Sequence, residues 1–187
     1  MEYHIQSKPT IYNGTKFRSR LEARWAAFFD LIGWRWQYES HDFNGWTPDF
    51  IVYGSDDRFI LIEIKPFIDD AVLIECKAKA IKSKFKGYSI LLSNEFKECD
   101  CYGGIFAGYC LSSPDPFDDG HFHVHWKNEQ NGINSEYDIG SLCVMYDGLL
   151  WMDNENRKIF IYDYKGDAAP IRTLWLKAQL LTSFNYA

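Results

Sequence analysis

The chain has 187 residues, of which 47% are hydrophobic and 18% aromatic, so its length suits one domain and its composition excludes intrinsic disorder. A formal net charge of −6 excludes a protein that coats nucleic acid non-specifically, because phosphate binding relies on clustered lysine and arginine. The chain has no apolar stretch long enough for a membrane span and no N-terminal signal-peptide profile. We therefore expect a cytoplasmic protein with no membrane partner.

The first half of the chain predicts a helix, three strands, a second helix and a fourth strand. Apolar residues recur at helical spacing over residues 19–32, where the first helix is expected. Turn residues separate three strands in a meander, at residues 34–39, 50–53 and 59–65. A second amphipathic helix over about residues 70–85 leads into a buried strand at 88–92. This order predicts an α/β fold whose central sheet is supplied by the meander.

The second half of the chain predicts a β-rich extension closed by a helix. Apolar patterns predict strands at residues 104–112, 121–127, 141–147, 149–153 and 158–164. Asp147-Gly148 predicts a hairpin turn between the third and fourth of these strands. A terminal helix over about residues 171–184 carries its apolar residues on one face, which indicates a packing role.

Two carboxylates and a lysine form the candidate catalytic group. Asp49 stands at the entrance to one strand, and after thirteen intervening residues the next strand offers Glu63 and Lys65. Strand side chains alternate between faces, so Glu63 and Lys65 share a face, and hairpin pairing lays Asp49 beside Glu63. Adjacent carboxylates repel unless a cation lies between them, and hard oxygen ligands suit Mg²⁺ or Mn²⁺. The carbonyl of Ile64 is a further candidate ligand, and Lys65 would support a water that attacks phosphorus.

Pro48-Asp49, thirteen residues and then Glu63-Ile64-Lys65 resembles the signature of the PD-(D/E)xK nuclease superfamily. The likeness extends to a preceding helix with an acidic residue, Glu22, and to a following lysine-bearing helix and strand, which complete that family's αβββαβ core. The resemblance covers about residues 16–93 and looks most like the small stand-alone nuclease-like proteins of phages and bacteria.

This resemblance implies a restriction-endonuclease-like core and a nuclease that cleaves DNA, with RNA left open as a substrate. It implies that Asp49 and Glu63 bind the metal, that Glu22 binds it directly or through water, and that Lys65 orients or activates water. We expect one α/β domain over residues 1–187, made of a nuclease core at 16–93 and a β-rich C-terminal extension with a terminal helix at 94–187.

Each of these residues also has a structural interpretation. Ser19-x-x-Glu22 fits a capping box, in which the glutamate satisfies the start of the helix. Pro-Asp is common at the start of a strand, and Glu63 with Lys65 would also suit an exposed ion pair. Four basic residues are candidates for contact with nucleic-acid phosphates, with a solvated surface as the alternative: Arg18, Arg20, Lys77 and Lys84.

Three further features leave alternatives open. His121, His123 and His125 line one face of a predicted strand, a pattern that suits either zinc binding or a half-exposed strand. The acidic charge also suits a non-cleaving nuclease-fold protein that binds nucleic acid or a protein partner, for example a phage factor that inhibits a host system. For the residues after Ser93, two roles are open: a homodimer surface and a substrate clamp.

Overall fold

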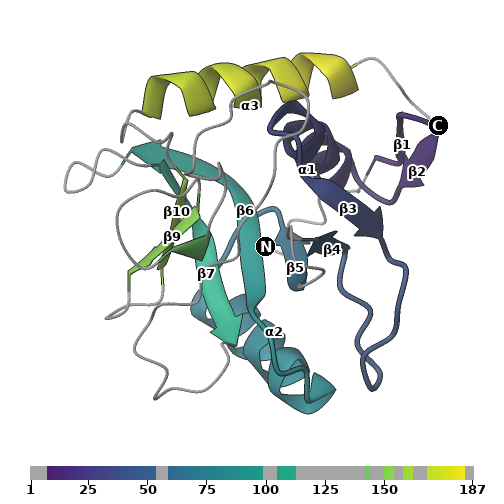
Figure 1. Ribbon diagram of the computed structural model, residues 1–187, viewed down its shortest axis with the longest axis vertical. Helices are drawn as coiled ribbons and strands as arrows, with labels where there is room; N and C mark the ends of the chain where they lie inside the picture. Colours follow the sequence, from purple (N-terminus) through teal and green to yellow (C-terminus); the bar gives the residue numbers. More distant parts are fainter. Residues whose placement is uncertain are drawn as a thin grey trace, which may run out of the picture.

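The computed structural model describes residues 8–53, 59–98, 105–112, 142–143, 150–153, 158–161 and 168–183. Within these ranges the chain has a mixed α/β fold (Figure 1). Its helices are α1 (Arg20–Leu31), α2 (Asp70–Ser83) and α3 (Ala168–Thr182). Its strands are β1 (Thr10–Tyr12), β2 (Thr15–Phe17), β3 (Arg35–Tyr38), β4 (Phe50–Tyr53), β5 (Phe59–Lys65), β6 (Ser89–Glu98), β7 (Ile105–Ser112), β8 (Leu142–Cys143), β9 (Leu150–Asp153) and β10 (Lys158–Ile161).

The strands other than β1 and β2 form one sheet in the order β3-β4-β5-β6-β7-β10-β9-β8. Strands β3, β4 and β5 pair antiparallel, which confirms the predicted meander. Strand β6 then pairs parallel to β5, and α2 makes the crossover between them. The predicted order of helix, three strands, helix and strand is therefore confirmed.

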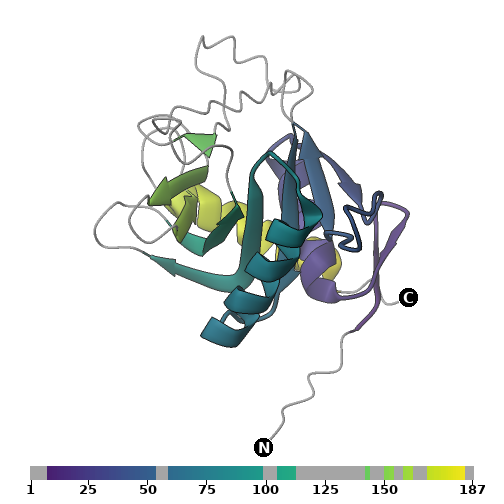
Figure 2. The same cartoon turned by 90° about the horizontal axis from the view of Figure 1, so that it is seen from below.

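Helices cover both faces of this sheet (Figures 1 and 2). The larger core cluster joins α1 and α3 to one face, where Ile60, Ile62 and Ile64 of β5 are buried. The smaller cluster joins α2 to the other face, where Leu61 is buried together with Trp46 of the β3–β4 loop. A strand buried on both faces has few polar positions, so the buried Glu63 in the second half of β5 is an exception that calls for a chemical explanation.

A short N-terminal hairpin, β1–β2, was not expected from the sequence. Its turn is Asn13-Gly14, and both residues have positive φ angles, of 46° and 75°. Asn-Gly is a strong hairpin signal, but the flanking strands have only three residues each. Phe17 at the end of β2 is fully buried and its ring lies 4.6 Å from that of Tyr38. The hairpin thus anchors the chain immediately before α1.

The structure corrects several details of the predicted elements. The turn expected at Asp147-Gly148 lies outside the described residues, but the antiparallel pairing expected on either side of it is wrong, because β8 and β9 pair in parallel, with Leu142 opposite Leu150. Apolar periodicity locates strands but carries no information about their direction, which explains this difference. Helix α2 ends at Ser83, since Lys84 adopts a left-handed conformation with φ 59°. The strand predicted at 121–127 lies outside the described residues, and so do its three histidines.

The helices of the described segments are too short or too polar to cross a lipid bilayer.

Candidate active site

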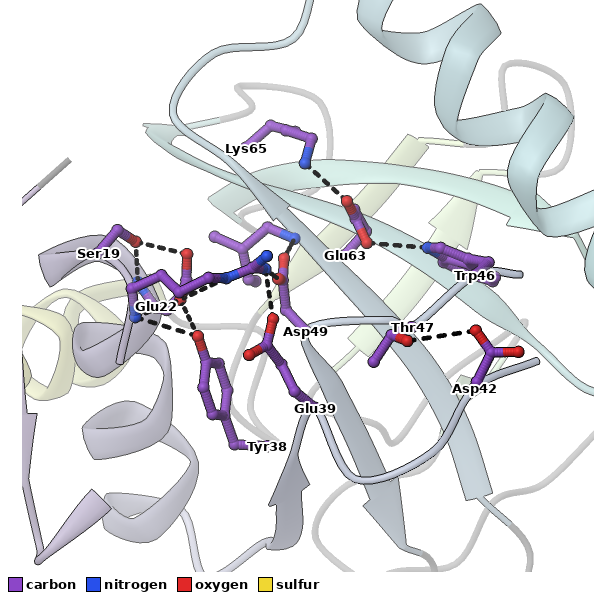
Figure 3. A network of polar contacts seen from close by, with 12 residues as sticks. Ser19, Glu22, Tyr38, Glu39, Asp42, Trp46, Thr47, Asp49, Glu63 and Lys65 are labelled. Atoms are coloured by element: carbon purple, nitrogen blue, oxygen red, sulfur yellow. Dashed lines mark hydrogen bonds and ion pairs between the residues drawn. The ribbon is translucent and has the colours of Figure 1, made fainter. Parts of the chain in front are cut away.

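The predicted catalytic residues lie where the first turn of α1, the ends of β3 and β5, and the entrance of β4 come together (Figure 3): Glu22, Asp49, Glu63 and Lys65. A pocket of about 570 Å³ opens at this junction. It is lined by Lys8, Arg18, Ser19, Arg20, Leu21, Glu22, Asp49, Ile64, Lys65 and Pro66. The pocket therefore combines carboxylates with four basic side chains, a mixture that suits an anionic substrate together with a cation.

Asp49 lies at the centre of the site and is only 1% exposed. Its Oδ2 accepts the backbone N–H of Ile64 at 2.6 Å, and its Oδ1 is 2.5 Å from Nη2 of Arg18. Burial, together with the negative charges of Glu63 and Glu22, raises the pKa of Asp49 from 3.8 to about 7. A carboxylate with so high a pKa favours a proton or a metal ion as its partner.

Glu63 and Lys65 form an ion pair beside Asp49, with Nζ of Lys65 2.6 Å from Oε1 of Glu63. The other carboxylate oxygen of Glu63 accepts the indole N–H of Trp46 at 3.1 Å. Burial lowers the pKa of Lys65, but the charge of Glu63, the hydrogen bond to its carboxylate and the charge of Asp49 together outweigh burial, so the pKa of Lys65 is raised. The predicted pairing of Asp49 with Glu63 agrees with the β4–β5 register, in which Phe50 lies opposite Ile62.

Glu22 takes part in the cap at the start of α1 and also lines the pocket. Ser19 is the N-cap of α1, and its Oγ accepts the backbone N–H of Glu22 at 3.2 Å. The Glu22 carboxylate also lines the pocket, where it accepts hydrogen bonds from the Ser19 hydroxyl, the Arg18 backbone N–H and the Tyr38 hydroxyl. The helix cap thus fixes an acidic side chain that is turned toward Asp49.

Arg18 bridges the acids at the mouth of the pocket. Its Nη2 is 2.7 Å from Oε1 of Glu39 in addition to its contact with Asp49, and its Nε is 4.0 Å from Oε2 of Glu22. The Arg18 side chain is 62% exposed, whereas Asp49 is buried beneath it. One solvent-facing guanidinium therefore offsets the charge of several acids.

The candidate nucleic-acid-binding residues divide into two groups. Arg18 and Arg20 line the pocket. Lys77 is half-buried on α2 and Lys84 is exposed at the end of that helix, and neither is among the lining residues. Of the four candidates, only Arg18, which precedes α1, and Arg20, its first residue, therefore lie at the pocket.

Four residues that contribute to the site were not among the predicted ones: Lys8, Tyr38, Glu39 and Trp46. The position of Glu39 could have been predicted from the meander. If the β3–β4 register is continued by one residue, Glu39 lies opposite Asp49, and the Glu39 backbone N–H donates to the Asp49 carbonyl at 3.0 Å. For Trp46 and Tyr38, nothing in the local sequence pattern identifies their carboxylate partners, Glu63 and Glu22.

The acids of the site fit a hard divalent ion. Their donors are all oxygen atoms, and the buried Asp49 carries a raised pKa that a bound cation would lower. Asp49 and Glu63, with the Ile64 carbonyl, would hold the ion, and Glu22 would add charge from α1. No three His, Cys, Asp or Glu side chains in the described part of the chain are already grouped as a metal centre, so binding requires some rearrangement of these acids.

The arrangement provides acidic ligands, a lysine beside them and basic side chains along one pocket. This set of groups is suited to hydrolysis of a phosphate ester. In comparisons with known proteins, no family model, curated protein or solved structure matches this chain.

Proposed function

We propose that this chain is a Mg²⁺- or Mn²⁺-dependent nuclease that hydrolyses phosphodiester bonds in DNA. The observation that carries the proposal is the placement of Asp49, which lines a basic pocket although it is only 1% exposed, and whose pKa is raised by burial and by the charges of Glu63 and Glu22. Lys65 lines the same pocket and is ion-paired to Glu63. A structural ion pair alone would not require a cluster of buried acids beside a basic pocket.

Each residue has a defined task in the proposed reaction. When bound, the divalent ion supplies an activated water and offsets charge on the phosphate oxygens. Asp49 and Glu63 act as its ligands. The ammonium of Lys65 would orient the attacking water and stabilise the negative charge that develops on the phosphate oxygens. Arg18 and Arg20 bind the backbone phosphates of the substrate along the pocket.

We further propose that the fold is the restriction-endonuclease-like core of the PD-(D/E)xK superfamily. Support comes from the order α1, β3, β4, β5, α2 and β6, which is the αβββαβ order of that core. The motif residues also occupy suitable positions, since Asp49 immediately precedes β4 and Glu63 and Lys65 lie in the second half of β5.

A digestion series tests the activity directly. Plasmid DNA, oligonucleotides and RNA are incubated with Mg²⁺, Mn²⁺ or EDTA and with wild type, Asp49→Asn, Lys65→Ala or Lys79→Ala. Lys79 is a matched control, because it forms an exposed ion pair with Glu75 on α2. We expect metal-dependent cutting that falls at least about a hundredfold in the first two variants and is unchanged in the third. Cutting that survives in Asp49→Asn and Lys65→Ala would refute the assignment.

A non-cleaving nuclease-fold protein is the second candidate. The observation that favours it is that Arg18 and Lys65 already neutralise Asp49 and Glu63, which gives the site a stable arrangement without an ion. This candidate predicts no cutting under any metal condition, together with binding of nucleic acid or a protein partner that Asp49→Asn leaves unchanged. The digestion series and a binding assay on the same proteins separate the two candidates.

A further inference from the structure

The guanidinium of Arg18 lies where a cation would be expected in an acidic pocket. A single nitrogen, Nη2, contacts Oδ1 of Asp49 at 2.5 Å and Oε1 of Glu39 at 2.7 Å. Asp49 has two carboxylate oxygens, and Oδ2 is already held by the backbone N–H of Ile64. Oδ1 is therefore the oxygen that an incoming ion would compete for, and Arg18 holds it.

We propose that Arg18 is a resident counter-ion that must leave Asp49 before a divalent ion binds, and that the released guanidinium binds a phosphate of the nucleic acid. The inference rests on the proposed function and adds to it a coupling between the ion and the substrate. Arg18 would thereby keep the acids neutralised in the free protein, and it would turn toward the substrate when the divalent ion and the nucleic acid are both bound.

The local structure permits this exchange at low cost. The Arg18 side chain is 62% exposed, so its movement does not disturb the core. Glu39, 29% exposed at the rim, would keep the released guanidinium near the pocket mouth. The backbone of Arg18 stays in place, because its N–H is bonded to Glu22 and Tyr38. Only the side chain has to move.

The exchange has a thermodynamic consequence. An arginine fork matches phosphate as well as carboxylate, so a phosphate that binds Arg18 weakens its hold on Asp49. The affinity of the site for the divalent ion then rises when nucleic acid is present. Because coupling between two ligands is reciprocal, the ion must strengthen nucleic-acid binding by the same factor.

The first test measures Mn²⁺ binding to the full chain without nucleic acid, from the electron paramagnetic resonance signal of free Mn²⁺. Four proteins are compared: wild type, Arg18→Ala, Arg18→Lys and Arg20→Ala. Arg20 lines the same pocket, so Arg20→Ala reports the general effect of removing one positive charge. Arg18→Lys keeps the charge but shortens the side chain and removes the forked donors. Thermal unfolding of each protein checks that the fold is retained.

We expect Arg18→Ala to bind Mn²⁺ about tenfold more tightly than wild type, the scale of a charge-assisted hydrogen bond. Arg18→Lys should shift in the same direction by about threefold, and Arg20→Ala should change affinity by less than about twofold. If Arg18→Lys matches wild type, or if Arg20→Ala equals Arg18→Ala, the effect is one of general charge and the inference is wrong.

A second measurement adds a short phosphorothioate-linked DNA duplex. We expect the duplex to tighten Mn²⁺ binding several-fold in wild type and to lose this effect in Arg18→Ala. Equal tightening in both proteins would overturn the coupling. If wild type and every Arg18 variant fail to bind Mn²⁺, the proposed function falls together with the inference. If wild type binds Mn²⁺, Asp49→Asn does not, and the Arg18 variants resemble wild type, only the inference falls.

Discussion

At the scale of single residues, Asp49 gives the protein a measurable dependence on pH. Its pKa is raised from 3.8 to about 7, so the folded state holds this proton more tightly than the unfolded state. Ionisation of Asp49 therefore reduces the free energy of unfolding as the pH rises from about 4 to about 7, and the reduction is complete above pH 7. In EDTA, urea unfolding across this range should show that wild type loses stability relative to Asp49→Asn.

If the stability of wild type relative to Asp49→Asn changed with pH in the opposite direction, a different interaction of Asp49 would be dominant. If wild type gained stability over Asp49→Asn as the pH rose, the contact with Arg18 would outweigh burial and would hold the pKa of Asp49 low. If the difference in free energy of unfolding between the two proteins stayed constant from about pH 4 to about pH 7, Asp49 would not titrate in this range.

The sequence predicted Asp49, Glu63 and Lys65 as neighbours because strand alternation and hairpin register are local properties. It did not predict the second partner of Glu63, since the Trp46 indole reaches that carboxylate from a loop seventeen positions earlier. Tyr38 was missed as a partner of Glu22 for the same reason, because contacts between a strand and a helix depend on tertiary packing. Local patterns thus located the acids but not the groups that hold them in place.

At the scale of the elements, the start of α1 links helix stability to the site. Ser19 caps α1 and bonds the Glu22 carboxylate, whereas Asp69 caps α2 by accepting the N–H of Val72 at 2.8 Å. Ser19→Ala and Asp69→Ala should each lower the free energy of unfolding by about 1 kcal/mol, measured by urea denaturation. Only Ser19→Ala should also weaken Mn²⁺ binding, because only that cap positions an acid of the pocket. Equal Mn²⁺ affinities in the two variants would exclude a positioning role for Ser19.

The elements of the first half were predicted well because each has a complete local signal. Strands β4 and β5 have the predicted bounds, and α1 differs from its predicted range by one residue at each end. The features that were not predicted, strands β1 and β2 and the direction of β8 relative to β9, leave no trace in the apolar periodicity of the sequence. Strands β1 and β2 are too short to show alternation, and the parallel pairing of β8 with β9 depends on the path of the whole chain.

At the scale of the whole molecule, α3 packs against α1 and joins the end of the chain to the core. Trp175 of α3 is 7% exposed, and its ring lies 4.8 Å from that of Trp25 and 5.8 Å from that of Phe28. Trp175→Ala should lower the free energy of unfolding by about 3–5 kcal/mol, because it leaves a cavity between the helices. Leu176→Ala is the control, since Leu176 is 59% exposed and should change stability by less than about 0.5 kcal/mol.

Urea unfolding followed by circular dichroism and by tryptophan fluorescence tests whether the chain unfolds as one unit. Coincident transitions in both variants would support the single domain expected from the sequence. Separate transitions, or a Trp175→Ala protein as stable as Leu176→Ala, would mean that α3 folds apart from the sheet.

Helix α1 contributes to the pocket and to the core at different points along its length. The residues that line the pocket all lie between Lys8 and Pro66, and α1 contributes only its first turn to them. Trp25 and Phe28, further along the same helix, meet α3 instead. Heat tolerance can therefore be engineered through the exposed side of α3, for example at Leu180, without altering the chemistry of the pocket. A search for variants that survive higher temperatures should begin there.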